Sequence, residues 1–198
     1  MQLFSEKVRL DLPDSDIWYF ANFFDFKKAD DFFESLRKNT PWQQDDIKVF
    51  GKVYAQPRLT ALYASNNRSY SYSNITMQPK PFTSNLLEIK TAIEEETDTL
   101  FTTCLLNLYR DGKDSNGWHS DDEKELGTNP VIASVTLGEE RNFHLRHKSD
   151  RTLKHKILLQ HGSLLLMKGE TQHFWQHQIA KTSRNIGERI NLTFRVIR

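Results

Sequence analysis

The sequence predicts a mainly β protein with flanking helices, and two observations lead to that fold class. After Leu100, short strand-like runs alternate with turn residues up to the end of the chain. Several short strands separated by turns are typical of a sandwich or a barrel. The two clear helical patterns both lie before Leu100. We therefore expect a β core that is preceded along the chain by helices.

The expected helices span residues 27–38 and 84–96. Apolar residues recur there at helical spacing, namely Ala29, Phe32, Phe33, Leu36, Leu86, Leu87, Ile89 and Ile93. Such a stripe predicts that one face of each helix packs on the core. The expected strands span residues 100–109, 131–137, 142–147, 155–160, 163–168, 174–179 and 189–197.

The last of these runs alternates strictly between polar and apolar residues. Its polar positions are Arg189, Asn191, Thr193 and Arg195, and its apolar positions are Ile190, Leu192, Phe194 and Val196. A half-buried strand with its polar face in water explains the pattern, since many antiparallel sheets have one solvated face. The alternative is a binding face, because two guanidinium groups suit the two carboxylates of a small diacid.

A second pattern indicates a metal. His119 and Asp121 stand two residues apart, and His177 follows shortly before the last strand. Alternate residues of an extended segment point the same way, so one strand end can supply two ligands. Two imidazoles and one carboxylate on one face of an octahedral ion leave open positions, as a non-haem Fe(II) oxygenase requires. Asn107 and Tyr109, also two apart, come just before this pair.

The ordered set of motifs resembles one family. It comprises QPRLT (56–60), YSYS (70–73), ITMQP (75–79), NLY (107–109), WHSDDE (118–123), IASVTLG (132–138), GSLLL (162–166), WQH (175–177) and RINLTFR (189–195). From about Asp45 onward the chain resembles the AlkB-type 2-oxoglutarate- and Fe(II)-dependent nucleic-acid demethylases, especially two mammalian homologues that repair alkylated DNA and RNA. The resemblance implies one domain (1–198), with a double-stranded β-helix (jelly-roll) core at about 100–198. An N-terminal extension and a nucleotide-recognition lid would occupy about 1–99.

The resemblance also implies a ligand set. Fe(II) would be held by His119, Asp121 and His177, leaving room for 2-oxoglutarate and dioxygen. The distal carboxylate of 2-oxoglutarate would bind Arg189, assisted by Tyr109, Asn191 and Thr193, and its metal-proximal end would contact Arg195 and Asn107. His173 competes with His177 if the segment is imagined as a helix, but the segment is bounded like a strand and the family motif aligns His177.

Residues that resemble the family's substrate site are less tightly defined by motif. Tyr70, Tyr72 and Ser73 resemble a lid whose aromatic rings stack on a base, although a hairpin with tyrosines at its rim explains them too. Asp122 and Glu123 resemble acidic residues that border a cationic methylated base. Phe50, Gly51 and Lys52 resemble a finger that fills the gap left by a flipped base, and a packed core position is the alternative for Phe50. Arg58 and Lys52 would contact phosphate.

The implied activity is oxidative demethylation of bases of the 1-methyladenine or 3-methylcytosine type in DNA and possibly RNA. Formaldehyde, succinate and carbon dioxide would be released. The finger resembles a duplex-acting branch, whereas the motifs at 105–110, 118–123 and 171–177 resemble a branch that prefers single strands. The alternatives are a 2-oxoglutarate-dependent hydroxylase of a protein or small molecule, and a nucleic-acid-binding jelly roll without catalysis.

Charge is distributed unevenly along the chain. Residues 1–140 hold 15 Lys and Arg against 23 Asp and Glu, whereas residues 141–198 hold 12 against 3, giving −8 and +9 and recovering the net +1. The densest basic segment, 141–156, is explained by a solvated hairpin or by a phosphate-contacting surface. A single cysteine, no apolar stretch of roughly 20 residues and no signal-peptide pattern lead us to expect a cytoplasmic protein without membrane contact, nuclear in a eukaryote. We expect it to be monomeric, although no feature of the sequence determines the oligomeric state.

Overall fold

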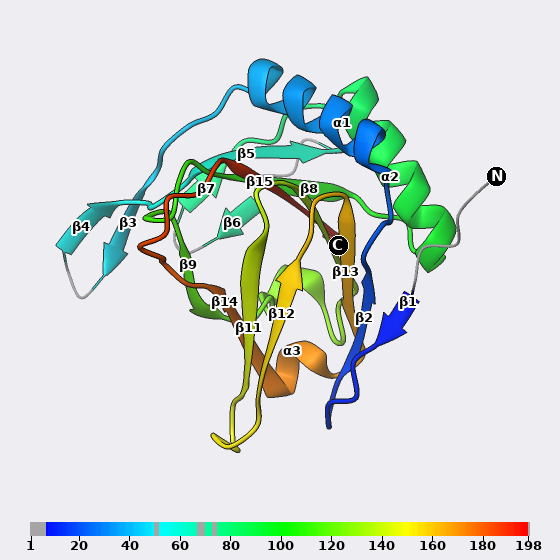
Figure 1. The fold of residues 1–198 in the computed structure, drawn as a ribbon, viewed down its shortest axis with the longest axis vertical. Coiled ribbons are helices and arrows are strands. Elements are labelled where there is room, and N and C mark those ends of the chain that lie inside the picture. The colour runs from blue at the N-terminus through cyan, green and yellow to red at the C-terminus, as the bar shows by residue number, and fades with distance from the viewer. Residues whose placement is uncertain (1–6, 50–51, 67–69, 73–74, 198) are drawn as a thin grey trace.

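Two antiparallel sheets lie face to face, and two helices cover the outer side of the larger one (Figure 1). The computed structural model describes residues 7–49, 52–66, 70–72 and 75–197, and for residues 47–49, 70–72, 75 and 76 it describes the backbone alone. The fold class expected from the sequence is confirmed. Among the described residues, no helix is long and apolar enough to cross a membrane.

The larger sheet has the strand order β1-β2-β13-β10-β15-β8-β5. In chain order the strands are β1 (Lys7–Arg9), β2 (Asp16–Phe20), β5 (Leu59–Ala64), β8 (Thr103–Tyr109), β10 (Ile132–Gly138), β13 (Ser163–Lys168) and β15 (Arg189–Arg195). β15 lies near the middle, paired on one side with β8 and on the other with β10. This central position buries every residue of β15.

The smaller sheet has the order β12-β11-β14-β9, with β9 (Asn116–His119), β11 (Arg141–His147), β12 (Lys154–Leu159) and β14 (Trp175–Ile179). Two separate hairpins pair β3 (Asp46–Val49) with β4 (Lys52–Ala55) and β6 (Tyr70–Tyr72) with β7 (Ile75–Met77). The first hairpin extends to one side of the molecule in Figure 1. A short 3-10 turn, η1 (Lys124–Leu126), follows β9.

Helices α1 (Phe26–Asn39) and α2 (Ser84–Thr97) agree with the predicted helices to within two residues at each end. Each begins with a side-chain cap, because Asp25 accepts from the backbone N–H of Lys28 and Thr83 from that of Leu86. Their apolar stripes pack on the outer face of the larger sheet in one buried cluster, except for Leu87, which was expected on the stripe but is 47% exposed. Burial of one large apolar side chain contributes about 1.5–3 kcal/mol, so this stripe fixes both helices on the sheet.

A second buried cluster fills the space between the two sheets. It combines β11 and β14 of the smaller sheet, through Phe143, Leu145 and Trp175, with strands of the larger one, through Leu105 and Met167. The alternation of β15 is divided between the two cores. Its apolar residues join the cluster under the helices, and its polar residues therefore face the interior between the sheets. The interpretation of this polar face as solvated is wrong.

A tight turn after β10 requires glycine. Gly138 has φ +82°, and a Cβ there would lie 2.4 Å from the carbonyl oxygen of Glu188 and 2.6 Å from the ring of Phe33. Gly138 ends β10 opposite Arg189 of β15, and the absence of a side chain there leaves room for α1. A side chain at this position would separate the helix from the sheet.

The seven expected strands are confirmed, with ends that differ by at most three residues. Strands β1 to β7 and β9 were not among them. Because β1, β2 and β5 belong to the larger sheet, that sheet takes strands from both sides of the boundary expected near residue 100. The segment before β14 also differs from expectation, since Thr171–Phe174 forms one helical turn, α3.

Candidate metal and co-substrate site

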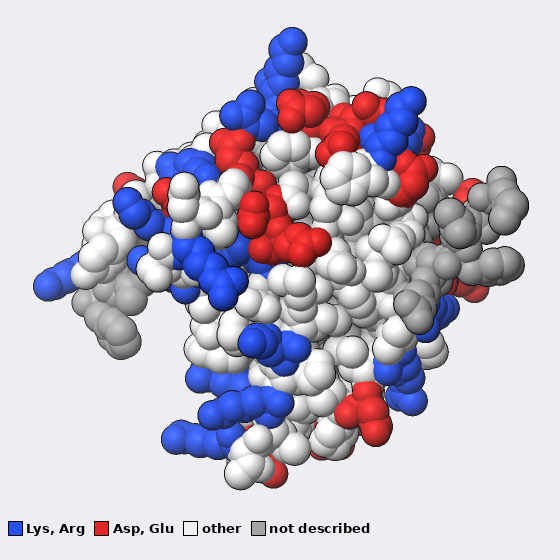
Figure 2. Space-filling model, viewed as in Figure 1, with Lys and Arg blue, Asp and Glu red and all other residues white. Residues whose placement is uncertain are grey.

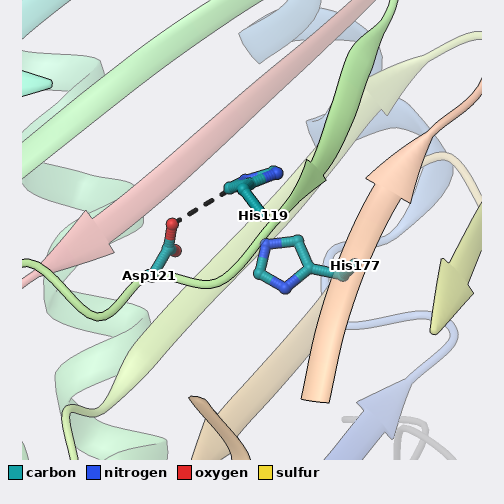
Figure 3. A group of neighbouring side chains, drawn as sticks. All are labelled: His119, Asp121 and His177. Atoms are coloured by element: carbon teal, nitrogen blue, oxygen red, sulfur yellow. Dashed lines mark ion pairs between the residues drawn. The ribbon is translucent and has the colours of Figure 1, made fainter. Parts of the chain in front are cut away.

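Neighbouring strands of the smaller sheet bring three potential metal ligands together. His119, at the end of β9, pairs directly with His177 on β14, and Asp121 follows two residues later on the same stretch of chain. The ligand atoms of the three side chains all lie within 4.8 Å of one another. Figure 3 shows the two imidazole rings side by side and the Asp121 carboxylate turned toward His119, where its Oδ1 lies 3.9 Å from Nε2.

Hydrogen bonds select the tautomer of His119. Its Nδ1 lies 2.7 Å from the carbonyl oxygen of Gly117, which can only accept, so Nδ1 carries the proton. Nε2 then presents a lone pair toward the cluster, where the Asn116 amide now approaches it at 3.2 Å. A second hydrogen bond that orients a histidine in this way is usual for metal ligands.

Protonation states also suit a cation. Burial, together with the neighbouring His119, lowers the pKa of His177 to about 3, so the imidazole is neutral at physiological pH. Burial likewise lowers the pKa of His119. For Asp121 burial acts the other way, but the guanidinium of Arg195 and the two imidazoles outweigh it and lower the pKa to about 2. The cluster therefore offers two neutral nitrogens and one carboxylate.

The polar face of β15 forms the adjoining wall. Arg189 is 1% exposed, and its Nη2 donates to Thr136 Oγ1 at 2.9 Å and to Asn191 Oδ1 at 2.8 Å. Asn191 in turn donates to Thr193 at 2.8 Å. The other two guanidinium nitrogens of Arg189, Nε and Nη1, have no hydrogen-bond partner among the described residues. Burial lowers the pKa of Arg189 to about 10, and the group still carries its charge at neutral pH.

One pocket contains both sets of residues. Its lining includes the three potential ligands, and from the expected co-substrate set Asn107, Tyr109, Arg189, Asn191, Thr193 and Arg195. The ring of Tyr109 lies under the Arg189 guanidinium, with 5.2 Å between the carbon Cζ and the ring centroid. At the metal end, Arg195 Nη2 lies 2.9 Å from Asp121 Oδ1. The structure therefore assembles every metal and co-substrate residue expected from the sequence.

His173 lies outside this pocket. It is exposed, and its Nε2 lies 2.8 Å from Asn129 Oδ1. The helical turn α3 ends at Phe174 and β14 begins at Trp175. The two histidines consequently do not share a helix face, and only His177 points into the cluster.

The residues expected to contact substrate are more widely spread. Lys52 is exposed on β4, while Tyr70 and Tyr72 lie on the β6–β7 hairpin with side chains outside the described set. Phe50, Gly51 and Ser73 lie outside the described residues.

Two acidic residues directly follow the Asp121 ligand. Asp122 is exposed, and its carboxylate accepts from Lys148 Nζ at 3.1 Å. Glu123 is partly buried just before η1. Both residues therefore directly follow the potential metal ligand Asp121 along the chain.

The structure does not agree with the expected phosphate contact of Arg58. Arg58 is 4% exposed, and its guanidinium donates to Asn107 Oδ1 at 2.7 Å and to the carbonyl of Ser115 at 3.0 Å. A buried arginine with these partners is not presented to a phosphate on the surface. Arg58 instead holds β5, β8 and the start of β9 together behind the pocket, because its donors are matched by acceptors on the latter two segments.

Several residues at the site were not expected. Ser134, which lines the pocket, and Thr136 lie on β10 opposite Thr193 and Asn191 of β15, and both hydroxyls bond to polar side chains of β15. Their alternation with apolar neighbours in 132–138 is a signal that could have identified them. Phe143 stacks on His177, with ring centroids 5.1 Å apart. Nothing in the sequence distinguishes that phenylalanine from other core residues.

Two imidazoles, one of them buried, and a carboxylate beside a buried arginine, between two antiparallel sheets, are the arrangement of a 2-oxoglutarate-dependent oxygenase. The family model for the 2OG-Fe(II) oxygenase superfamily matches residues 16–195, and the chain belongs to that family. Membership supports the expected Fe(II), 2-oxoglutarate and dioxygen.

The particular relatives narrow the family. The chain is 46% identical over 189 residues to the alpha-ketoglutarate-dependent dioxygenase alkB homolog 3 of Bos taurus, covering 88% of this chain and 64% of that protein. For the Homo sapiens protein of the same name the values are 43%, 92% and 66%. The DNA oxidative demethylase ALKBH2 of Arabidopsis thaliana is 37% identical, with 92% and 67% covered. The chain thus spans about two thirds of the length of these curated relatives.

The solved structure of OsALKBH1 superposes with a TM-score of 0.64, covering 96% of this chain and 99% of that one, at 16% identity. At that identity the likeness concerns the fold alone. It agrees with a jelly-roll core in which two sheets enclose the site.

Proposed function

We propose that this protein is an Fe(II)- and 2-oxoglutarate-dependent dioxygenase that removes N-methyl groups from bases of the 1-methyladenine and 3-methylcytosine type in DNA and RNA. The observation that carries the proposal is one pocket that contains both the His119, Asp121 and His177 cluster and the buried, partly unbonded guanidinium of Arg189. The relatives named as alkB homolog 3 and as a DNA oxidative demethylase support the choice of substrate class.

The cluster fits Fe(II). Its three donors come from two neutral imidazoles and one ionised carboxylate, and they lie close enough together to share one ion. His119, Asp121 and His177 would hold the ion, and because all three line the pocket, a co-substrate that enters it could reach the ion. The ordered Asp121–Arg195 contact keeps the carboxylate ionised.

The wall beside it fits 2-oxoglutarate. Arg189 has two guanidinium nitrogens available to one carboxylate of the diacid, and a buried charge of this kind needs such a counterion. Tyr109, Asn191 and Thr193 surround the same end of the pocket. Arg195 lies beside the metal ligand, where it would meet the end of the co-substrate that approaches the metal.

Iron and 2-oxoglutarate, when bound, supply the oxidation of the methyl C–H bond by dioxygen, with succinate and carbon dioxide as co-products and formaldehyde released from the hydroxymethyl base. The chain itself supplies positions and surroundings. Phe143, Leu105 and Ile179 form apolar pocket walls that exclude water from one side of the site. Asp122 and Glu123, which directly follow Asp121, are proposed to face a cationic methylated base.

A basic groove next to the site supports a nucleic-acid substrate. Arg146, Lys148, Arg151 and Lys154, from β11, β12 and their connection, line it. The Arg146 guanidinium stacks at 4.2 Å over the ring of Trp118, the residue before His119. Figure 2 shows Lys and Arg gathered at the end of the molecule where this hairpin projects, away from the acidic residues over α1. Lysines and arginines so arranged suit phosphate groups.

Two hairpins outside the main sheets are proposed to contact the nucleic acid. The β3–β4 hairpin, with Lys52 exposed, is proposed to act as a finger on duplex substrates, and the β6–β7 hairpin with Tyr70 and Tyr72 as the base-recognition lid. We propose that the enzyme acts as a monomer in the compartment that holds its nucleic acid, the cytoplasm or, in a eukaryote, the nucleus.

The test is direct. Purified protein is supplied with Fe(II), 2-oxoglutarate and a single-stranded oligonucleotide that carries one 1-methyladenine or 3-methylcytosine. Mass spectrometry should show loss of the methyl group, and the Asp121→Ala variant should show none. Turnover of 2-oxoglutarate with an unchanged oligonucleotide would favour a protein or small-molecule hydroxylase. Oligonucleotide binding without any turnover would favour a non-catalytic binding module.

A further inference from the structure

The metal aspartate lies where the strand that carries it has ended. β9 stops at His119, and the next residues make no further strand pairs with β14. Two bonds to the following part of the chain hold the segment instead. Ser120 Oγ donates to the carbonyl of Trp175 at 3.0 Å, and the backbone N–H of Asp121 donates to Gln172 Oε1 at 2.9 Å.

We infer that Gln172 is a positioning residue for the metal ligand Asp121. The inference rests on the proposed Fe(II) site and adds a role for Gln172, which belongs to the motif at 171–177 but not to the ligand cluster. Gln172 is 0% exposed and lies on α3, one residue before the exposed His173. An amide side chain of this length is rarely buried unless it is bonded.

The side-chain oxygen of Gln172 satisfies a buried backbone donor, the N–H of Asp121. Asp121 is 1% exposed, so its backbone N–H is out of water and requires an acceptor. No strand partner remains to supply one, and Gln172 does. A buried N–H left without a partner would be unfavourable, and the segment would rotate to regain a hydrogen bond.

Two anchors together determine where the carboxylate lies. Gln172 holds the backbone of Asp121, and Arg195 holds its Oδ1 at 2.9 Å. With only the second anchor, the carboxylate would follow the guanidinium away from the two histidines. With both, the oxygen stays within 4.8 Å of the imidazole nitrogens, in place for an ion.

Gln172 is itself fixed. Its backbone carbonyl accepts from Lys148 Nζ at 2.8 Å, and its Nε2 donates weakly to the sulfur of Met167 at 3.6 Å. These contacts orient the amide so that Oε1 points toward Asp121. The side chain therefore acts as a rigid support, and it does not touch the co-substrate wall on β15.

The test compares metal affinity in matched variants. Gln172→Met keeps the length and apolar stem but removes the acceptor, and His173→Ala changes the adjacent exposed residue. Isothermal titration with Mn²⁺ should show a Kd roughly ten- to hundredfold weaker for Gln172→Met, the usual range for a lost supporting contact, and no change for His173→Ala. The visible absorption of bound Co²⁺ should also shift in Gln172→Met, because the geometry around the ion changes.

Gln172→Glu is the rescue variant, since it retains an oxygen of the same reach. It should bind Mn²⁺ within about threefold of the unchanged protein, a change well below the ten- to hundredfold loss expected for a missing support. The Mn²⁺ affinity of Gln172→Glu still tests the inference if the Gln172→Met variant does not fold. Equal Mn²⁺ affinity for Gln172→Met and the unchanged protein would overturn the inference, as would a Gln172→Glu variant that loses tenfold or more. Absence of Mn²⁺ binding by the unchanged protein would instead contradict the proposed metal site.

Discussion

Replacement of Arg189 by Met tests the co-substrate site most sharply. The substitution removes a buried guanidinium that donates to Thr136 and Asn191 and has two nitrogens without partners among the described residues. We expect it to raise the KM for 2-oxoglutarate while leaving the affinity for an unmodified oligonucleotide unchanged, because the basic groove lies on other strands.

The magnitude follows from burial. Loss of one partner of a buried ion pair costs about 3–5 kcal/mol, because the other charge is left out of water without a counterion. At about 1.4 kcal/mol for each factor of ten, the KM should rise roughly 140- to 3,700-fold. Arg189→Lys keeps a charge but loses the two-pronged geometry. Its KM for 2-oxoglutarate should therefore lie between the values of the unchanged protein and of Arg189→Met.

The thermal stability of the ligand-free protein should not fall in Arg189→Met, although the substitution removes contacts. Without co-substrate, Arg189 is a buried cation whose pKa is lowered to about 10 by burial, so its charge opposes folding. The melting temperature of ligand-free Arg189→Met should therefore be no lower than that of the unchanged protein. Saturating 2-oxoglutarate should raise the melting temperature of the unchanged protein only.

The assay is succinate formation against 2-oxoglutarate concentration, with thermal melts alongside. Arg9→Met is the matched control, because Arg9 lies exposed on β1, far along the sheet from β15. A KM within threefold of the control for Arg189→Met would refute the assignment, since the diacid would then be held elsewhere. A large loss in both variants would indicate general damage to the sheet.

Three further outcomes are expected. Asp121→Ala should abolish Mn²⁺ binding in titration and demethylation together, whereas His173→Ala should retain most of both; the reverse pattern would contradict the ligand set. Phe50→Ala should slow repair of a methylated duplex roughly tenfold for each 1.4 kcal/mol of lost wedge energy, and equal slowing on single strands with a lowered melting temperature would indicate a packed side chain. Arg151→Gln should reduce the salt slope of oligonucleotide binding by about one, and an unchanged slope would exclude this groove.

Much of the site could be predicted because it lies on period-2 patterns. The face of β15 from Arg189 to Arg195 is visible as an alternation, and so is the pair His119 and Asp121. What the alternation does not tell is whether the polar face meets water or a pocket. That depends on the smaller sheet, which lies over it in the fold, and on the helices that occupy the opposite side.

Other features depend on tertiary contacts that leave no local signal. Arg58 looked like a surface cation, and its burial follows from acceptors on two distant segments. Gln172 belongs to a single helical turn, and its partner lies 51 residues earlier in the chain. β1 escaped prediction because it has only three residues, and β2 depends on its pairing with the distant strand β13.

The central claim is that one pocket couples oxidation of 2-oxoglutarate to removal of a methyl group from a base. The most direct measurement is the stoichiometry of succinate and formaldehyde when the purified protein acts on an oligonucleotide with one 3-methylcytosine. The account predicts equal amounts of both products, each equal to the amount of cytosine restored, and none of this with the Asp121→Ala variant. Succinate formed at the same rate without any methylated oligonucleotide, and with no formaldehyde, would contradict it.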